Sequence, residues 1–201
     1  MVRRSESRWR CVWCCAMTPL TSVLLAALVA AVAVFVVSSI VHMALPIHKS
    51  DMKGLPQEDA VLDALRKAGV SAGEYMFPWC SSMQEMGSEA MKQKWERGPT
   101  GTVIVRPAGG LAMGRSLGQW FVLCLVTSFF VAYALSLVLA PGAQNVFRVA
   151  SSVAFLGYGF GSASNSVWKS VPWSTTFKFC FDALLYALAT GAAFAWMWPA
   201  A

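Results

Sequence analysis

The chain has 201 residues, of which 57% are hydrophobic and 13% are charged, and its formal net charge is +6. Globular proteins have about 45–50% apolar and about 25% charged residues, so this composition argues against an ordinary soluble domain. The basic residues do not gather on one face. Four arginines lie in the N-terminal tail, and residues 47–118 hold nine Lys/Arg against eight Asp/Glu. The charge therefore indicates a basic tail beside a membrane rather than a nucleic-acid-binding surface.

Four apolar stretches are long enough to cross a membrane. The bilayer's hydrocarbon core is about 30 Å thick and a helix rises about 1.5 Å per residue, so about 20 apolar residues span it. The stretches are residues 20–41, 119–140, 146–168 and 176–198. Each should be helical, because lipid offers the backbone no hydrogen-bond partner. The sequence predicts an all-α membrane protein with four transmembrane helices and a small α+β extramembrane domain between the first and the second.

The N-terminal tail, residues 1–17, is basic and contains Cys11, Cys14 and Cys15. The apolar run that follows exceeds the roughly 7–15 residues of a signal-peptide core, which favours a retained anchor. Whether Met1 or Met17 starts the protein stays open. The three cysteines lack further ligands for a metal, so free or acylated thiols are the favoured interpretation.

The remaining chain divides into a first transmembrane helix (18–46), a polar domain (47–117) and a three-helix transmembrane unit (118–201). Pro141-Gly142 predicts a tight turn after the second span, because proline cannot continue a helix and glycine adopts unusual dihedrals. The link over 169–175 is also short. The last three spans are therefore expected to run up, down and up.

The polar domain has predicted elements of its own. Pro56 and the acids after it indicate a helix start, and Gly69 its end. A second helix is expected from Ser82, with Glu85 completing a capping box, up to Gly98-Pro99. Residues 102–106 are β-branched and predict a strand. A lone strand is unstable, so we expect it to pair with residues 75–77.

An even number of spans places both termini on one side of the membrane and the polar domain on the other. The arginines of the tail favour a cytoplasmic N-terminus. Other basic residues flank the spans on the side of the polar domain and favour the opposite arrangement, with a cytoplasmic polar domain. They are Lys49, Lys53, Arg106, Arg115, Lys169 and Lys178. The count leans towards the second arrangement, and the sidedness stays open.

A polar stripe marks the last span, where Lys178, Asp182, Tyr186 and Thr190 recur every four residues and so share one helical face. An intramembrane carboxylate is costly and suggests a functional site. Two interpretations follow. Either Lys178 pairs with Asp182 and Tyr186 donates to it as structural glue, or the stripe is part of a proton or ion pathway. Structural pairing is favoured because no other span carries an acid.

The third span contains Gly157 and Gly161, a small-xxx-small pair that permits close helix packing. Asn165 lies further along the same helix and is expected to reach across towards the Asp182 stripe. Close packing is a better explanation of these residues than ligand binding.

Two further groups invite a functional interpretation. His42 and His48 flank Pro46 at the exit of the first span and are weak candidates for a metal or haem site. Solvated histidines at a helix end are commoner, so no metal and no cofactor are predicted. Tyr75, Phe77 and Trp79 could form a small core, a membrane-dipping surface or a contact for a partner.

Three segments resemble a family of uncharacterised bacterial integral membrane proteins of about 180–200 residues. They are Ser38-Ser39-Ile40-Val41-His42-Met43, Tyr75-Met76-Phe77-Pro78 and Trp173-Ser174-Thr175-Thr176-x-Lys178-x-x-x-Asp182. The likeness covers roughly residues 17–199. It implies a multi-pass protein of the bacterial inner membrane and carries no activity over to this chain.

No hydrolytic constellation is visible, because the two histidines lie together without an obvious nucleophile. We therefore expect a non-enzymatic structural or accessory subunit of a larger membrane assembly, with an energy-transducing complex, respiratory or photosynthetic, as a plausible host. Its expected partners are the lipid bilayer and other membrane subunits. The alternative is a small ion- or proton-coupled transporter or channel subunit that uses Asp182.

Overall fold

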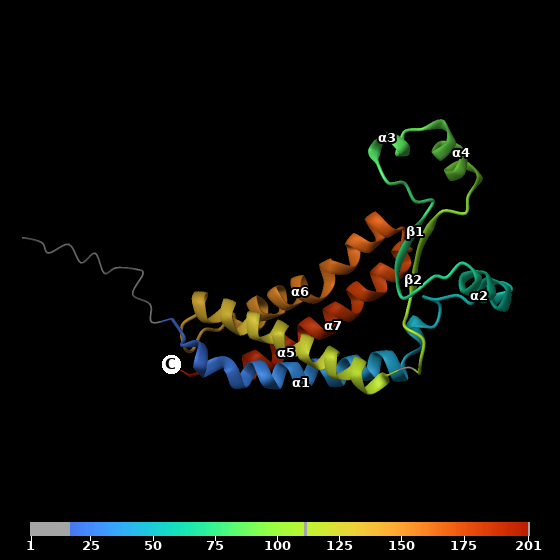
Figure 1. The fold of residues 1–201 in the computed structure, drawn as a ribbon. Coiled ribbons are helices and arrows are strands. Elements are labelled where there is room, and N and C mark those ends of the chain that lie inside the picture. Colours follow the sequence, from blue (N-terminus) through green and yellow to red (C-terminus); the bar gives the residue numbers. More distant parts are fainter. Residues whose placement is uncertain (1–16, 111, 201) are drawn as a thin grey trace, which may run out of the picture.

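The structure is a computed structural model and describes residues 17–110 and 112–200 (Figure 1). Predictions for the tail, including those for Cys11, Cys14 and Cys15, lie outside the described residues. The fold is mostly helical with one small sheet. Its elements in chain order are α1 (Leu20–Ala44), η2 (Pro46–His48), α2 (Glu58–Lys67), β1 (Gly73–Phe77), α3 (Met83–Met86), α4 (Glu89–Arg97), β2 (Gly101–Val105), α5 (Met113–Val138), α6 (Val146–Lys169) and α7 (Trp173–Met197).

The four long helices α1, α5, α6 and α7 form one elongated bundle (Figure 1). Helix α7 packs against α6 on one side and α1 on the other, and α1 also packs against α5. The start of α1 and the end of α7 lie at the same end of this bundle (Figure 1). Both described ends of the chain are thus at one end of the bundle.

Three of the bundle helices, α1, α5 and α7, are long and apolar enough to cross a membrane. The fourth predicted span corresponds to α6, which is not among them. Helix α6 has 24 residues, a comparable length, but it carries Arg148 and many glycines and serines. The expectation of four spans is therefore met for three helices, and α6 is less apolar than the sequence analysis assumed. Helix α5 also begins at Met113 and α7 at Trp173, earlier than expected.

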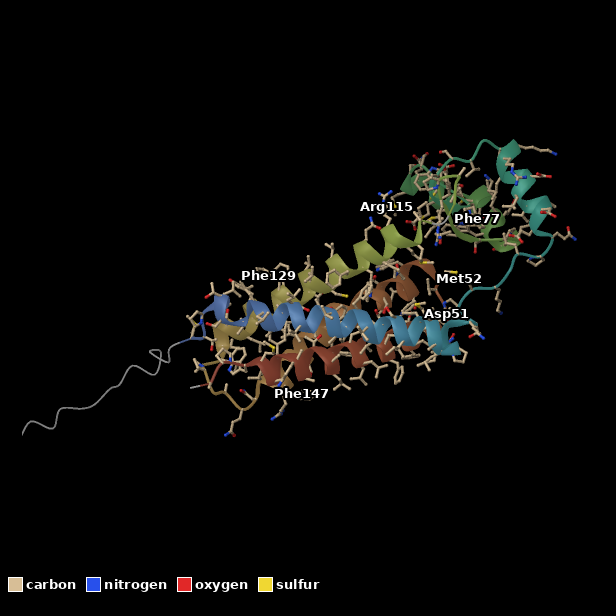
Figure 2. The ribbon with its side chains drawn as sticks, turned by 90° about the horizontal axis from the view of Figure 1, so that it is seen from below. Asp51, Met52, Phe77, Arg115, Phe129 and Phe147 are labelled. Atoms are coloured by element: carbon tan, nitrogen blue, oxygen red, sulfur yellow. The ribbon has the colours of Figure 1, made fainter. Side chains whose placement is uncertain are left out.

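Many small residues are buried in the bundle beside a few large ones such as Phe194 and Leu135, while most of its large apolar residues point outward. Ala26, Ala30 and Ala31 of α1 are at most 1% exposed. By contrast, Figure 2 shows Phe129 and Phe147 on the outside of the bundle, and each is about 40% exposed. A water-soluble protein buries its largest apolar side chains. Small residues between helices and large ones outside are the arrangement that suits helices packed in lipid.

The turn at Pro141-Gly142 joins α5 and α6 at the end of the bundle where both described termini lie. Gly142 has a positive φ of 74°, which only glycine adopts freely, and its N–H donates to the carbonyl of Pro199 at 2.9 Å. The hydroxyl of Thr18 donates to the carbonyl of Leu139 at 2.8 Å. These bonds tie both described ends of the chain to the α5–α6 turn.

Residues 51–110 form an arm that rises beyond the other end of the bundle (Figure 1). Its sheet is the predicted pair, with β1 antiparallel to β2 and Tyr75 opposite Val103. The predicted helix from Ser82 to Arg97 is broken in two, because the chain turns at Gly87 and Ser88 caps a new helix, α4. One ion pair ties the sheet to the bundle, between Lys169 Nζ and Glu74 Oε1 at 2.7 Å.

Candidate functional site

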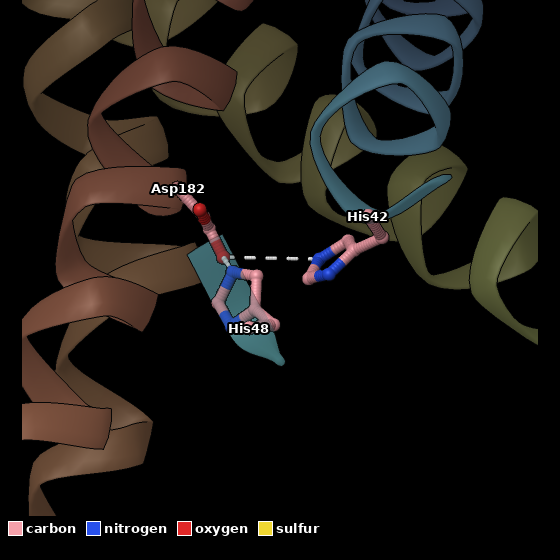
Figure 3. Close-up of side chains that lie close together, drawn as sticks. All are labelled: His42, His48 and Asp182. Carbon is pink, nitrogen blue, oxygen red and sulfur yellow. Dashed lines mark ion pairs between the residues drawn. The ribbon is translucent and has the colours of Figure 1, made fainter. Parts of the chain in front are cut away.

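A cluster of titratable side chains lies where the arm leaves the bundle. His42 comes from the last turn of α1, His48 from the 3-10 turn η2, and Asp182 from α7 (Figure 3). Pro46 explains this convergence, because it cannot continue α1 and forces the preceding Leu45 into an extended conformation. The chain then folds back in one turn and carries the ring of His48 over the end of the bundle. We call His42, His48 and Asp182 the histidine–aspartate cluster.

Asp182 is the buried member of the histidine–aspartate cluster and is 1% exposed. Its Oδ2 lies 2.9 Å from His48 Nε2 and 3.7 Å from His42 Nε2. These are ion-pair distances. The contact with His42 is too long for a hydrogen bond, and the one with His48 is close enough but is not aligned as a good one, so neither oxygen of Asp182 has a well-aligned hydrogen-bond partner among the described residues. A buried carboxyl group in this state is stable only if it is protonated or if a positive charge lies beside it.

A second carboxylate, Asp51, supports the other side of His48. Its Oδ2 accepts a hydrogen bond from His48 Nδ1 at 2.6 Å, and its Oδ1 accepts one from Lys178 Nζ at 2.6 Å. Burial alone would raise the pKa of Asp51, but the hydrogen bonds from Lys178 and His48 outweigh it and hold that pKa below its usual value. Asp51 is therefore an ionised acceptor, and the proton on His48 sits on Nδ1.

Tyr186 lies one turn beyond Asp182 and contacts His42. Its hydroxyl is 3.1 Å from His42 Nε2, and its ring packs against the rings of Trp120 and Tyr158. Trp120 in turn donates from Nε1 to Ser38 Oγ at 2.8 Å, which links α5 to α1. The aromatic rings therefore fix the position of the tyrosine hydroxyl beside the histidine–aspartate cluster.

The histidine–aspartate cluster borders a cavity of about 670 Å³ inside the bundle, which we call the bundle cavity. Polar atoms enter its mostly apolar wall from four helices; the polar lining residues are Ser38, Ser39, His42, Ser116, Thr127, Tyr158, Ser162, Asp182 and Tyr186. A second hollow of about 510 Å³, lined by residues 42–46, 48 and 49, meets the bundle cavity at His42 and Met43. The side chain of His42 therefore borders both the bundle cavity and the second hollow.

The structure places the predicted stripe of α7 differently from the expectation. Lys178 does not pair with Asp182; it contacts Asp51 and Ser50. Tyr186 is hydrogen-bonded to His42 rather than to Asp182. Thr190 is buried, and its hydroxyl donates to the carbonyl of Tyr186 in its own helix. The spacing of four correctly placed these residues on one face, but it could not show that two histidines occupy the space beside Asp182.

Asn165 and the glycine pair of α6 also differ from the expectation. Asn165 is exposed, and its carbonyl caps the end of α6. A Cβ added at Gly157 would lie 3.1 Å from the methyl of Thr127, whereas no described neighbouring atom lies within 4 Å of one at Gly161. The pair is therefore not one packing surface.

The close approach of α6 and α7 occurs instead at Gly159 and Gly191, which the sequence analysis missed. A Cβ on Gly159 would lie 3.3 Å from Ala183 Cβ, and one on Gly191 would lie 2.0 Å from Ser151 Oγ. Gly191 follows the buried Ala183 and Ala187 at a spacing of four residues, which was the available signal.

The aromatic residues of the arm lie away from the histidine–aspartate cluster. Tyr75 and Phe77 are on β1, Trp79 follows it, and their exposed fractions range from 37% to 69%. They do not form a core. Their exposure suits a contact with a membrane or with a partner, which are the two other expected roles.

Comparisons with protein-family models, with curated proteins and with solved structures found no match to this chain.

Proposed function

We propose that this protein is a four-span integral protein of a bacterial inner membrane that serves as a non-enzymatic accessory subunit of a larger membrane assembly. The fourth crossing would be α6. Its 24 residues extend about 36 Å at about 1.5 Å per residue, enough to span the hydrocarbon core. Its outward side chains include Leu156, Phe160 and Val167, each about 60% exposed. The bacterial inner membrane rests on the resemblance of the three sequence segments alone.

The main support for an accessory role is that the arm has almost no hydrophobic core. Among the described residues 51–110, Met91 is the only buried one. Large apolar side chains are exposed throughout this segment: Met52, Leu55, Tyr75, Met76, Phe77, Trp79, Met83, Met86, Trp95 and Ile104. A segment of this size is marginally stable without burial of apolar surface. Contact with a partner subunit would provide that burial.

Photo-crosslinking in native membranes tests the accessory role. A photoreactive residue at Trp79 should capture one recurring membrane protein, and gentle extraction followed by mass spectrometry should recover the same protein. A photoreactive residue at Phe181, which is exposed on α7, is the control for random membrane contacts. Repeated isolation as a lone monomer, with no recurring crosslink from Trp79, would contradict the proposal.

A second candidate function is a small ion- or proton-coupled transporter or channel subunit, and one observation favours it. Asp182, Tyr186 and His42 all line the bundle cavity. In liposomes, Asp182→Asn should abolish coupled flux, because it removes the charge that the histidines face. Asp63→Asn on the exposed face of α2 is the matched control and should leave flux intact. Unchanged flux in Asp182→Asn would remove this candidate.

A further inference from the structure

We propose that His42, His48 and Asp182 form a binding site for a divalent transition-metal ion, of the class with two histidines and one carboxylate. This inference goes beyond the accessory role and does not depend on it. Imidazole and carboxylate together suit the first-row ions from Mn²⁺ to Zn²⁺. Zn²⁺ is taken as the reference ion.

The ligand atoms lie close enough together for one ion to gather them with a small movement of the side chains. The three ligand atoms lie within 4.8 Å of one another, and Asp182 Oδ2 is 2.9 Å from His48 Nε2 and 3.7 Å from His42 Nε2. Tetrahedral Zn²⁺ with bonds of about 2.0–2.1 Å holds its ligand atoms about 3.4 Å apart. The two distances from Asp182 lie on both sides of that value, and the two histidine nitrogens, which lie within 4.8 Å of each other, would have to take up a similar separation when the ion binds. Figure 3 shows the three side chains converging on one point from α1, η2 and α7.

The buried polar atoms of the cluster provide a second, independent observation. His48 Nε2 and both oxygens of Asp182 are buried and have no aligned hydrogen-bond partner among the described residues. Buried polar groups are nearly always satisfied. A cation between the imidazole and the carboxylate would satisfy His48 Nε2 and Asp182 together.

The surroundings of His48 match the support that metal-binding histidines usually have. Its Nδ1–H donates to Asp51 at 2.6 Å, which in the neutral imidazole leaves the lone pair on Nε2, 2.9 Å from Asp182 Oδ2. Lys178 and Ser50 hold the loop around Asp51 in turn, since Lys178 Nζ donates to both. A carboxylate that orients a histidine in this way fixes the tautomer that binds the metal.

The site has a route for the ion and an open position. The side chain of His42 is 41% exposed and borders both hollows, so an ion can reach the cluster from outside the bundle. Three protein ligands leave a fourth position for water or another small ligand, as in catalytic zinc sites. The hydroxyl of Tyr186 is hydrogen-bonded to His42 Nε2 at 3.1 Å, so an ion that binds this nitrogen would displace the hydroxyl on the wall of the bundle cavity.

Metal titration of the purified full chain in detergent tests the inference. After treatment with a chelator, calorimetry should show about one tightly bound Zn²⁺ per chain, and Co²⁺ should give the visible absorption of a tetrahedral site. His42→Gln and His48→Gln should remove this signal. Asp51→Asn should weaken binding about 10–100-fold through the loss of its support of His48. Asp63→Asn is the control and should bind as the wild type does.

The N-terminal cysteines are the competing source of metal binding. The triple variant Cys11→Ser, Cys14→Ser, Cys15→Ser should retain the ion, because these residues are outside the proposed ligand set. His42 is exposed, so His42→Gln should keep the helical circular-dichroism spectrum and remain interpretable even if His48→Gln does not fold. Absence of binding by the wild type, wild-type affinity in His42→Gln, or loss of binding in the cysteine variant would each overturn the inference.

Discussion

At the scale of single residues, the histidine–aspartate cluster shows that the ion-pair partner of a buried carboxylate cannot be read from the spacing of residues along one helix. Lys178 is one helical turn from Asp182, and that spacing predicts a pair between them. In the structure, the lysine reaches Asp51 at 2.6 Å, and His48 takes the position beside Asp182. The two carboxylates thus have different partners. Their pairing depends on how the loop after α1 folds back, which the sequence does not specify locally.

Lys178→Met should destabilise the protein, because Asp51 would lose a partner while remaining buried. The side chains of Asp51 and Lys178 are 10% and 25% exposed, so this ion pair is intermediate between a fully buried pair and a surface pair. We expect a loss of about 1–3 kcal/mol of unfolding free energy, measured by thermal unfolding in detergent.

Lys169→Met is the matched control, because the Lys169–Glu74 pair is 39% and 47% exposed and should contribute only about 0–1 kcal/mol. Equal losses in the two variants would show that burial does not distinguish these pairs.

Glu85 in the arm should titrate at a lower pH than an ordinary glutamate. The N–H and the hydroxyl of Ser81 both donate to its carboxylate at 2.8 Å and hold its pKa below the usual 4.5. A folded-state pKa below the unfolded one means that the stabilisation is fully present above about pH 4.5 and is lost as pH falls through the lowered pKa.

Carbon-13 NMR of the glutamate carboxyls measures this titration. Ser81→Ala should raise the midpoint of Glu85 towards 4.5, because one of the two donors is removed. An unchanged midpoint in Ser81→Ala would show that the hydroxyl does not contribute.

At the scale of elements, the contact of α6 with α7 depends on Gly191. A Cβ there would lie 2.0 Å from Ser151 Oγ and 2.9 Å from the backbone carbonyl of Phe147. The side chain of Ser151 can rotate away from the added Cβ, but the backbone carbonyl of Phe147 can move away only if the two helices separate. Gly191→Ala should therefore cost about 1–3 kcal/mol of unfolding free energy, measured by thermal unfolding in detergent.

Gly161→Ala is the control on the same helix pair. No described neighbour lies within 4 Å of an added Cβ there, so alanine should be neutral or stabilise α6 by about 0.5–1 kcal/mol. If both variants lost stability equally, the helix crossing would not lie at Gly191.

The element-level predictions succeeded where the signals were local. The strand at residues 102–106 and its pairing with residues 75–77 follow from β-branched composition and from the need of a strand for a partner.

The break at Gly87 was missed, because Ser82 and Ser88 are both good caps and composition does not choose between one helix and two. The packing glycines were missed because a small-xxx-small pattern does not show which face meets a neighbour.

At the scale of the whole molecule, the apolar stretches predicted the membrane class, and the inverted placement of small and large residues agrees with it. The histidine–aspartate cluster was out of reach of sequence reasoning. His42 and Asp182 are separated by most of the chain, and only the docking of α7 against α1 brings them together. Asp51 follows His48 by three residues, but the sequence does not show that Asp182 lies beside both histidines, so a solvated helix end was the expected environment.

The most direct test of the four-span account is the sidedness of the two ends of α6. Single cysteines at Gln144 and Ser174, both exposed, would flank α6 in a background without the native cysteines. A membrane-impermeant maleimide applied to sealed, right-side-out vesicles should label only one of the two, because α6 crosses the bilayer. Labelling of both positions from the same side, in vesicles shown to be sealed, would contradict the fourth crossing and the account that depends on it.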